Sequence, residues 1–318
     1  MNPLQLVAAM VCLATVTMVT TGYGKEPAAK LGSSAEAQTS EENRQKEAEE
    51  AKRLTEFYLR NQSVFVHKNE FILEVNTLYS RNSQQTFVPV AGGVVTTNDT
   101  RQFLDNTLIA RYGLLDGLEL DLIVPVFVHG ENESNFGTTQ VKDQKDGVGD
   151  IGGAIRYEAW YEQGNRPAVV IDVSGKSRTG GDGLTGTGNW NAGGGVTLIK
   201  TMDPVVFFGR LGYTYNFASH TRNLGNIVDY RIGMGFSLND RVAFNVQFAG
   251  ASIGSSSIVG SDSTTGPLTF STQHISVMNL IFTTTVQVTR NLFIEPLVGV
   301  GLTEQSFTLV GLRLPYRF

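Results

Sequence analysis

The chain has 318 residues, of which 41% are hydrophobic and 17% are charged, and its formal net charge is −5 at pH 7. A soluble domain carries about 25% charged residues, so this chain is short of charge without being apolar overall. That balance is typical of a protein that faces lipid on one side and water on the other. Lysines and arginines are scattered and form no basic face, which excludes nucleic acid as an expected partner.

The N-terminus predicts a signal peptide at residues 1–24. An apolar segment from Pro3 to about Gly22 ends in a small-x-small sequence, Gly22-Tyr23-Gly24, and charged residues follow at once. Because no Lys or Arg precedes the apolar segment, a retained anchor helix remains the alternative. The single cysteine, Cys12, lies inside the segment, so the mature chain is expected to use neither disulfides nor thiolate chemistry.

Residues 25–66 predict a periplasmic leader that contains a short helix. Glu41 to Asn61 is rich in helix formers, and its weakly apolar edge consists of Ala48, Ala51, Thr55 and Tyr58. The stretch is shorter than three heptads and therefore does not establish a coiled coil. A solvated spacer, an oligomerising helix and a plug for a pore all remain open as its role.

From residue 67 to residue 318 the hydrophobic period becomes two, which predicts β-strands. No helix would bury the alternation of Val242, Phe244, Val246 and Phe248 with small or polar residues. The expected fold is therefore all-β, a transmembrane antiparallel up-and-down β-barrel of about 12 strands, an even number as bacterial barrels require. The runs that carry the pattern lie at about 70–79, 101–113, 117–128, 149–161, 167–176, 190–200, 204–217, 226–238, 241–251, 275–288, 291–301 and 306–318.

The connections between these runs alternate between tight turns and longer polar segments, as in outer-membrane barrels. Both ends of the barrel therefore fall on one side, which is the periplasmic side if the chain enters from there. The turns are rich in Gly, Asn and Asp, as in Leu115-Asp116-Gly117. Longer outer loops, rich in Gly, Ser, Thr, Asn and Asp, are expected at about 81–100, 129–148, 177–189, 218–225 and 252–274.

The last predicted strand carries an assembly signal. Its apolar face ends in Leu314, Tyr316 and Phe318, and the chain stops at that phenylalanine. A terminal aromatic on the lipid face of the final strand matches the sorting signature of outer-membrane proteins. We therefore expect outer-membrane lipid and the barrel assembly machinery as partners. A soluble β-sandwich would instead leave this apolar strand as an unprotected edge.

Two short glycine patterns suggest enzymes, but both lack the required context. Gly147 to Gly152 has the spacing of a dinucleotide loop without a preceding strand or a following helix. Gly250 to Gly254 has the spacing of a nucleophile elbow, yet it runs into a serine-rich loop. The four histidines show no metal-ligand spacing. We therefore expect that the protein is not an enzyme and binds no cofactor and no metal. If the barrel were a lipase, His274 and Ser276 would be the candidate catalytic pair.

Charged residues on the face opposite the apolar one are expected to line the lumen, because a charge at the middle of the lipid face costs about 2–4 kcal/mol. These residues either pair across neighbouring strands or set the field that a permeating solute meets. Beyond the residues proposed to line the pore, the full inward set also includes Glu70, Asp105, Glu119, Asp121, Asp172 and Arg317. The residues proposed to line the pore are Glu74, Arg111, Asp150, Arg156, Glu158, Arg210, Asp229, Arg231, Glu295 and Arg313.

Several segments, taken together, resemble a family of outer-membrane barrels known as transporters of the MetA pathway of phenol degradation. They are residues 111–120 with Val124-Pro125, 147–151 with Arg156-Tyr157, 203–209 with 213–215, and 301–303 with 314–318. The last two pairs look like the branch that contains the functional-amyloid secretion channel. The resemblance implies a 12-stranded pore with a periplasmic helical leader, which in the amyloid-export members helps to form homo-trimers and plugs the lumen.

The function that these observations predict is an outer-membrane pore or transporter. It would pass a solute or an exported polypeptide through a charged lumen and be gated by the N-terminal helix. The alternative, from another class of protein, is a non-conducting outer-membrane scaffold or adhesin that binds through its extracellular loops. The substrate, its direction and the oligomeric state do not follow from the residues.

Overall fold

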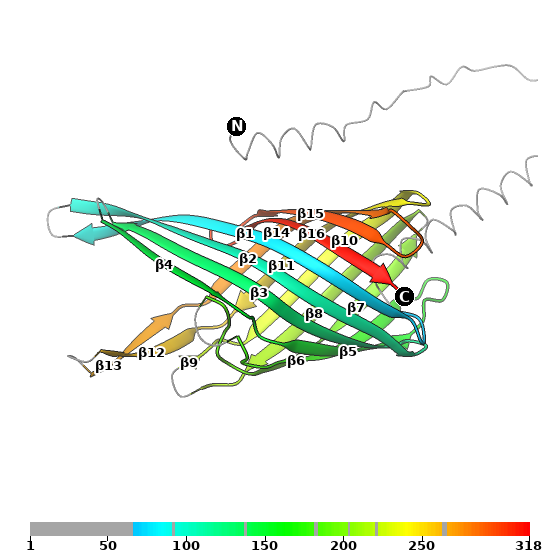
Figure 1. Ribbon diagram of the computed structural model, residues 1–318, viewed down its shortest axis with the longest axis horizontal. Coiled ribbons are helices and arrows are strands. Elements are labelled where there is room, and N and C mark those ends of the chain that lie inside the picture. The colour runs from blue at the N-terminus through cyan, green and yellow to red at the C-terminus, as the bar shows by residue number, and fades with distance from the viewer. Residues whose placement is uncertain are drawn as a thin grey trace, which may run out of the picture. The chain divides into compact units, whose positions relative to one another are not determined.

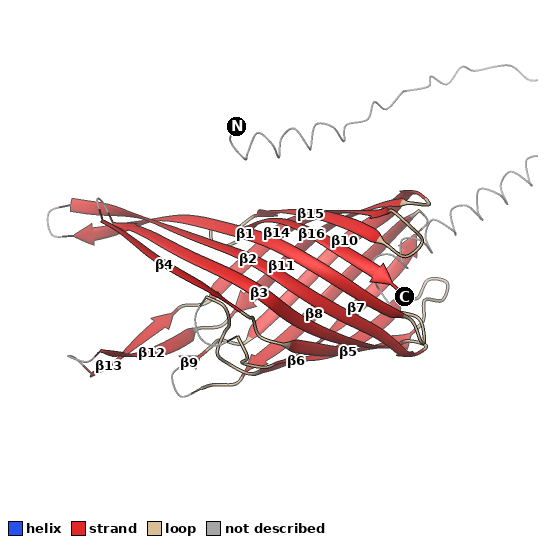
Figure 2. Cartoon of the chain, in the orientation of Figure 1, coloured by secondary structure: helices blue, strands red, loops and turns tan. Residues whose placement is uncertain are grey.

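The computed structural model describes residues 66–90, 93–136, 139–180, 184–202, 204–219, 222–262 and 266–318. The predicted signal peptide and all but the last residue of the predicted leader, with its helix, lie outside these residues. The described chain is built of strands and the turns between them (Figures 1 and 2). No helix in this part of the chain is long and apolar enough to cross a bilayer.

Twelve strands close into an antiparallel barrel, which confirms the predicted fold. Consecutive strands pair around the ring, and the first pairs with the last, as in Val75 opposite Leu314. The ring consists of β1 (Phe71–Val90), β2 (Gly93–Leu115), β3 (Leu118–Phe136), β5 (Gly152–Trp160), β6 (Ala168–Lys176), β7 (Asn191–Met202), β8 (Val205–Asn216), β10 (Ile227–Asn239), β11 (Val242–Ile253), β14 (Ile275–Gln287), β15 (Phe293–Gly301) and β16 (Thr308–Arg317).

The barrel is apolar outside and polar inside, the reverse of a soluble protein. Leu211 and Ile232 face outward and are 62% and 63% exposed, whereas Glu119 and Thr285 face inward and are fully buried. This follows from the alternation of each strand, since every second side chain points to the same face. Closure also pairs the backbone groups of the first and last strands, so no open sheet edge meets lipid.

Three of the expected loops are wrong in part, because they contain β-hairpins. β1 and β2 remain paired beyond the barrel as far as Val90 and Gly93, and β4 (Thr139–Gly147) adds to the outer half of β3. β12 (Ser256–Asp262) and β13 (Gly266–Thr272) form a small sheet with β9 (Arg222–Asn223). No bilayer imposes an apolar face on segments outside the barrel wall, so they lack the sustained alternation on which the strand prediction depended.

Pro125 lies on β3 at the boundary between the inner half of the strand, which pairs with β5 in the barrel wall, and the outer half, which pairs with β4. The register between β2 and β3 shifts between Asn106 and Thr107, next to this proline. Gly149 donates its backbone N–H to the Pro125 carbonyl at 2.9 Å, and a Cβ on Gly149 would lie only 2.6 Å from the proline ring. Two sequence segments that carry the family resemblance therefore meet where β4 gives way to β5. The strand predicted at 149–161 accordingly begins at Gly152.

Candidate functional site

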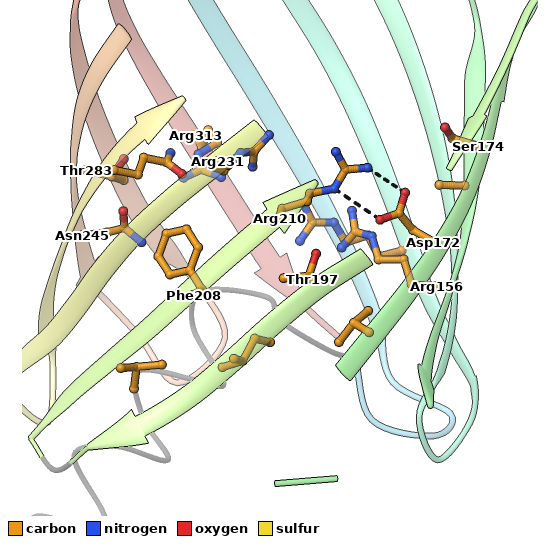
Figure 3. Close-up of a pocket in the computed structure, with 16 residues that line it drawn as sticks. Arg156, Asp172, Ser174, Thr197, Phe208, Arg210, Arg231, Asn245, Thr283 and Arg313 are labelled. Carbon is orange, nitrogen blue, oxygen red and sulfur yellow. Dashed lines mark hydrogen bonds and ion pairs between the residues drawn. The ribbon is translucent and has the colours of Figure 1, made fainter. Parts of the chain in front are cut away.

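The lumen contains a cavity of about 430 Å³ that is lined by strands from around the barrel (Figure 3). Five arginines and a single carboxylate face it: Arg111, Arg156, Arg210, Arg231, Arg313 and Asp172. The rest of its wall combines hydroxyl and amide side chains with an apolar patch of Val170, Ile199, Val206 and Phe208. Arginines therefore outnumber carboxylates among the residues that line the cavity, although the chain as a whole is acidic.

Arg210 of β8 is the most strongly paired of these arginines. Its Nη2 and Nε donate to the two carboxylate oxygens of Asp172 at 2.7 and 3.2 Å (Figure 3). It also pairs with Asp229. Gly195 on β7 leaves the room that the guanidinium needs, because a Cβ there would lie 2.7 Å from Arg210 Nη2. Planar two-point pairing of this kind fixes the side chain in one orientation.

Three further arginines pair with acids that are nearly inaccessible to solvent. Arg156 contacts Glu119 at 3.1 Å and Asp121 at 2.6 Å. Arg111 lies 3.4 Å from Glu74, and Arg313 lies 3.1 Å from Glu295. In each pair the acid is more deeply buried than the arginine, so the acids hold the arginines while the arginines face the lumen.

Arg231 of β10 differs from the other four. It lies directly opposite Arg210 on β8 and opposite Ala249 on β11. Its surface is solvent-exposed even though the barrel wall surrounds it, because the side chain reaches into the open cavity. Among the described residues no carboxylate forms an ion pair with it.

The structure brings together eight of the ten residues predicted to line the pore. Arg111, Arg156, Arg210, Arg231 and Arg313 line the cavity, while Glu74, Asp229 and Glu295 pair with them. Glu158 lies on β5 near the turn at Gly117. Asp150 precedes β5 and holds a loop instead. The sequence did not lead us to predict the apolar patch, although the two-residue period places Val206 and Phe208 on the same face of the strand as Arg210.

Asp150 clamps the loop between β6 and β7. Its carboxylate accepts hydrogen bonds from the backbone N–H of Gly180 and of Thr187, both at 2.9 Å, and from Lys176 Nζ at 2.9 Å. Burial alone would raise the pKa of this carboxyl, but the hydrogen bonds from Thr187, Lys176 and Gly180 outweigh it and hold the pKa below its usual range. The clamp joins the start of β5 to the outer loop.

We expect the clamp to be intact above the ordinary aspartate pKa of about 3.9 and to be lost as the pH falls through the lower value in the folded protein. Hydrogen exchange at the Gly180 and Thr187 amides, corrected for the intrinsic rate, measures this. In Asp150→Asn both amides should exchange about 10- to 100-fold faster at pH 7, since a charged hydrogen bond contributes about 1.5–3 kcal/mol. Equal protection in both proteins would show that the carboxylate does not hold the loop.

The histidine proposed for a lipase pair has a different partner. His274 Nε2 lies 2.6 Å from Ser252 Oγ, the central serine of the Gly250 to Gly254 pattern, and not from Ser276. A serine hydrolase needs an acid that orients the histidine. Within the described residues no carboxylate hydrogen-bonds His274, and no group of His, Cys, Asp and Glu side chains has the geometry of a metal site.

The C-terminal aromatics lie on the outer face at the end with the short turns. Phe318 is 65% exposed, its ring centroid lies 4.7 Å from that of Tyr316 and 5.5 Å from that of Phe71, and its N–H donates to the Phe71 carbonyl at 2.9 Å. These contacts bury only part of the ring. The residue is therefore a small contributor to folded stability.

We expect Phe318→Ala to lower the free energy of unfolding by only about 1–2 kcal/mol by area. It should lower the yield in the outer membrane of cells far more, because the residue is proposed to be read by the assembly machinery. The measurement compares outer-membrane yield with refolding into detergent, and Val300→Ala on the same outer face is the control. An equal loss in both assays would reduce Phe318 to a packing residue.

A closed antiparallel barrel with an apolar outer belt and a polar lumen is a transmembrane barrel of the bacterial outer membrane. No family model matches the chain. Its fold is similar to that of an outer membrane channel from Pseudomonas putida F1, with a TM-score of 0.54 and 12% identity over 80% of this chain and 97% of the channel. The translocator domain of the autotransporter NalP from Neisseria meningitidis gives a TM-score of 0.45 and 10% identity over 89% of this chain and 98% of that one. The likeness shows the fold alone.

Proposed function

We propose that the protein is a pore that passes a small solute across the outer membrane through its arginine-lined lumen. The observation that carries the proposal is the cavity of about 430 Å³ inside the barrel, whose surface presents five arginines and one carboxylate. Rings of basic side chains favour anions in pores. The volume is also in the range of sites for small molecules, about 300–1,000 Å³. This favours a solute over the exported polypeptide that the resemblance to the amyloid-secretion branch suggests.

Conductance in planar bilayers tests the proposal. The purified full chain should form channels, and the reversal potential in a KCl gradient should indicate a preference for chloride. Arg231→Gln should reduce that preference, because it removes the most exposed charge from the lumen. A protein that inserts into the bilayer and passes no current, even after removal of residues 36–60, would contradict the pore.

The proposal includes gating by the leader, residues 25–66. Val66 is only 1% exposed, and its N–H donates to the buried Glu119 carboxylate at 2.8 Å. Asn69 donates its N–H to the Gly113 carbonyl at 2.8 Å. Both contacts hold the chain against the inner wall of β2 and β3 just before β1 begins. This supports a leader whose C-terminal end lies inside the periplasmic mouth, from which its helix would occlude the lumen.

Deleting residues 36–60 while keeping the signal peptide should raise single-channel conductance if the segment plugs the pore. If the segment instead assembles the homo-trimer that the family resemblance implies, the deletion should change the mass seen by native mass spectrometry. Unchanged conductance and unchanged mass would leave it as a spacer.

A scaffold or adhesin is the second candidate, because the outer sheet extends beyond the barrel. β1 to β4 form this sheet, and the described side chains of β4 are exposed almost throughout (Figure 1). Removing residues 130–146, the outer parts of β3 and β4, separates the two functions. A pore keeps its conductance, whereas an adhesin loses binding of cells to its ligand surface.

A further inference from the structure

We propose that the lumen cavity binds an organic monocarboxylate with an apolar body the size of a single ring. The inference rests on the proposed pore function, because the solute reaches the cavity through the lumen. It names the class of solute that the pore would select. Three features of the cavity carry it: one unpaired charge, an apolar patch within reach of that charge, and a limited volume.

The first feature is that, among the residues the structure describes, one arginine of the cavity has no ion pair. Arg111, Arg156, Arg210 and Arg313 are each neutralised by at least one acid. Arg231 on β10 lies directly opposite Arg210 on the adjacent strand β8 and is also repelled by Arg156 and Arg313. Asp229, two residues away on the same strand, attracts it, but that carboxylate is bound to Arg210.

Like charges that lie directly opposite each other in a sheet are destabilising. An arginine kept in such a place, exposed to the cavity and without its own carboxylate, has a guanidinium that is free to bind an anion from the lumen. Guanidinium groups bind carboxylates through two parallel hydrogen bonds. Because Arg231 is the one arginine of the cavity without an ion pair among the described residues, it offers a single two-point site, which a ligand with one carboxylate occupies.

The second feature is the apolar patch. Phe208 and Val206 project from β8 on the same face as Arg210, and Val170 and Ile199 project beside them from β6 and β7. Figure 3 shows Phe208 turned into the same interior as the arginines. Val170, Ile199 and Val206 pack together and are 5%, 5% and 1% exposed, so the half-buried ring of Phe208 is the part of the patch that the apolar body of a solute can contact. A phenylalanine adds stacking or edge contacts with a ring, about 0.5–1.5 kcal/mol beyond the area buried.

The third feature is the volume, about 430 Å³, which is enough for a ring, its carboxylate and some water. An inorganic anion would bind Arg231 and make no contact with the apolar patch. A neutral hydrocarbon would use the patch and leave the arginine uncompensated. An aryl monocarboxylate uses both.

Benzoate is the probe that tests the inference, and isothermal titration calorimetry on the detergent-solubilised full chain is the measurement. We expect one benzoate per chain, with binding at least tenfold tighter than that of acetate, which lacks the ring, and of benzamide, which lacks the charge. Arg231→Gln and Phe208→Leu should each weaken benzoate binding about tenfold or more. Arg241→Gln, which removes an arginine from the turn between β10 and β11, is the control and should bind as the unaltered chain does.

The benzoate titration can fail while the pore function is confirmed, so the two proposals are tested separately. Channels that conduct KCl while the protein binds benzoate no better than acetate and benzamide would overturn the inference and leave the pore intact. Equal weakening by Arg231→Gln and Arg241→Gln would also overturn it, because the effect would then reflect net charge and not the cavity. Heat-modifiable migration in gels shows that each variant is folded before titration.

Discussion

Arg313→Met should destabilise the barrel by about 3–5 kcal/mol, because it leaves a buried carboxylate without its cation. Glu295 and Arg313 lie directly opposite each other on β15 and β16, and their side chains meet at 3.1 Å. Glu295 is only 3% exposed, and its other described contact is the Thr285 hydroxyl at 3.2 Å. Methionine preserves much of the volume, so the loss measures charge and hydrogen bonding more than packing.

The double variant with Glu295→Gln is the matched control. Glutamine fits the same space without a charge, so the double variant should recover most of the lost free energy of unfolding. Urea unfolding in phospholipid vesicles, read by tryptophan fluorescence, measures both proteins. If the single and double variants are equally unstable, then Arg313 acts by filling space and the account of the lumen as a network of compensated charges is wrong at this pair.

Leu211→Lys should cost about 2–4 kcal/mol, because it places a charge in the middle of the lipid-facing surface. Leu211 is 62% exposed at the centre of β8, between the inward residues Arg210 and Gly212. Val141→Lys is the control, since Val141 is 54% exposed but lies on β4, which extends beyond the barrel wall. That substitution should change stability by no more than about 0.5 kcal/mol.

The same unfolding measurement in vesicles compares the two lysine variants. If both lysines faced water, neither would change the free energy of unfolding much. A difference between the two variants therefore shows that Leu211 faces lipid. Equal effects would mean that Leu211 does not face the bilayer interior, in conflict with the orientation of the whole barrel.

The barrel could be predicted from the sequence because its determinants are local. One side chain in two must be apolar along every strand that faces lipid, and tight turns must join neighbouring strands, so both signals appear in short windows. The outer hairpins of β1 to β4 and of β12 and β13 gave no such signal. They stand outside the barrel, so nothing imposes an apolar face on them.

The inward charges could also be predicted, but their partners could not. A pair such as Arg210 with Asp172 joins residues from β8 and β6 across β7, and it depends on the register of three strands and on the space left by Gly195. Asp150 was placed on a strand because the glycine-rich segment continues the pattern of β5, whereas Pro125 and Gly149 delay the start of that strand. Among the described residues Arg231 has no ion pair, and this can be seen only once the positions of all its neighbours are known.

The most direct test of a conducting lumen compares cysteines at two neighbouring residues of β6. Ser174 lines the cavity, whereas Val173 points outward and is 61% exposed. Cys12 is the only cysteine in the sequence and lies in the predicted signal peptide, so each variant would carry a single thiol. A methanethiosulfonate reagent with a sulfonate group, whose negative charge repels chloride, is added to single channels in a planar bilayer. Modification of Ser174→Cys should lower the chloride current in a stepwise manner, and Val173→Cys should be unaffected. Unchanged current through a Ser174→Cys channel whose modification is verified by mass spectrometry would contradict permeation through the arginine-lined cavity.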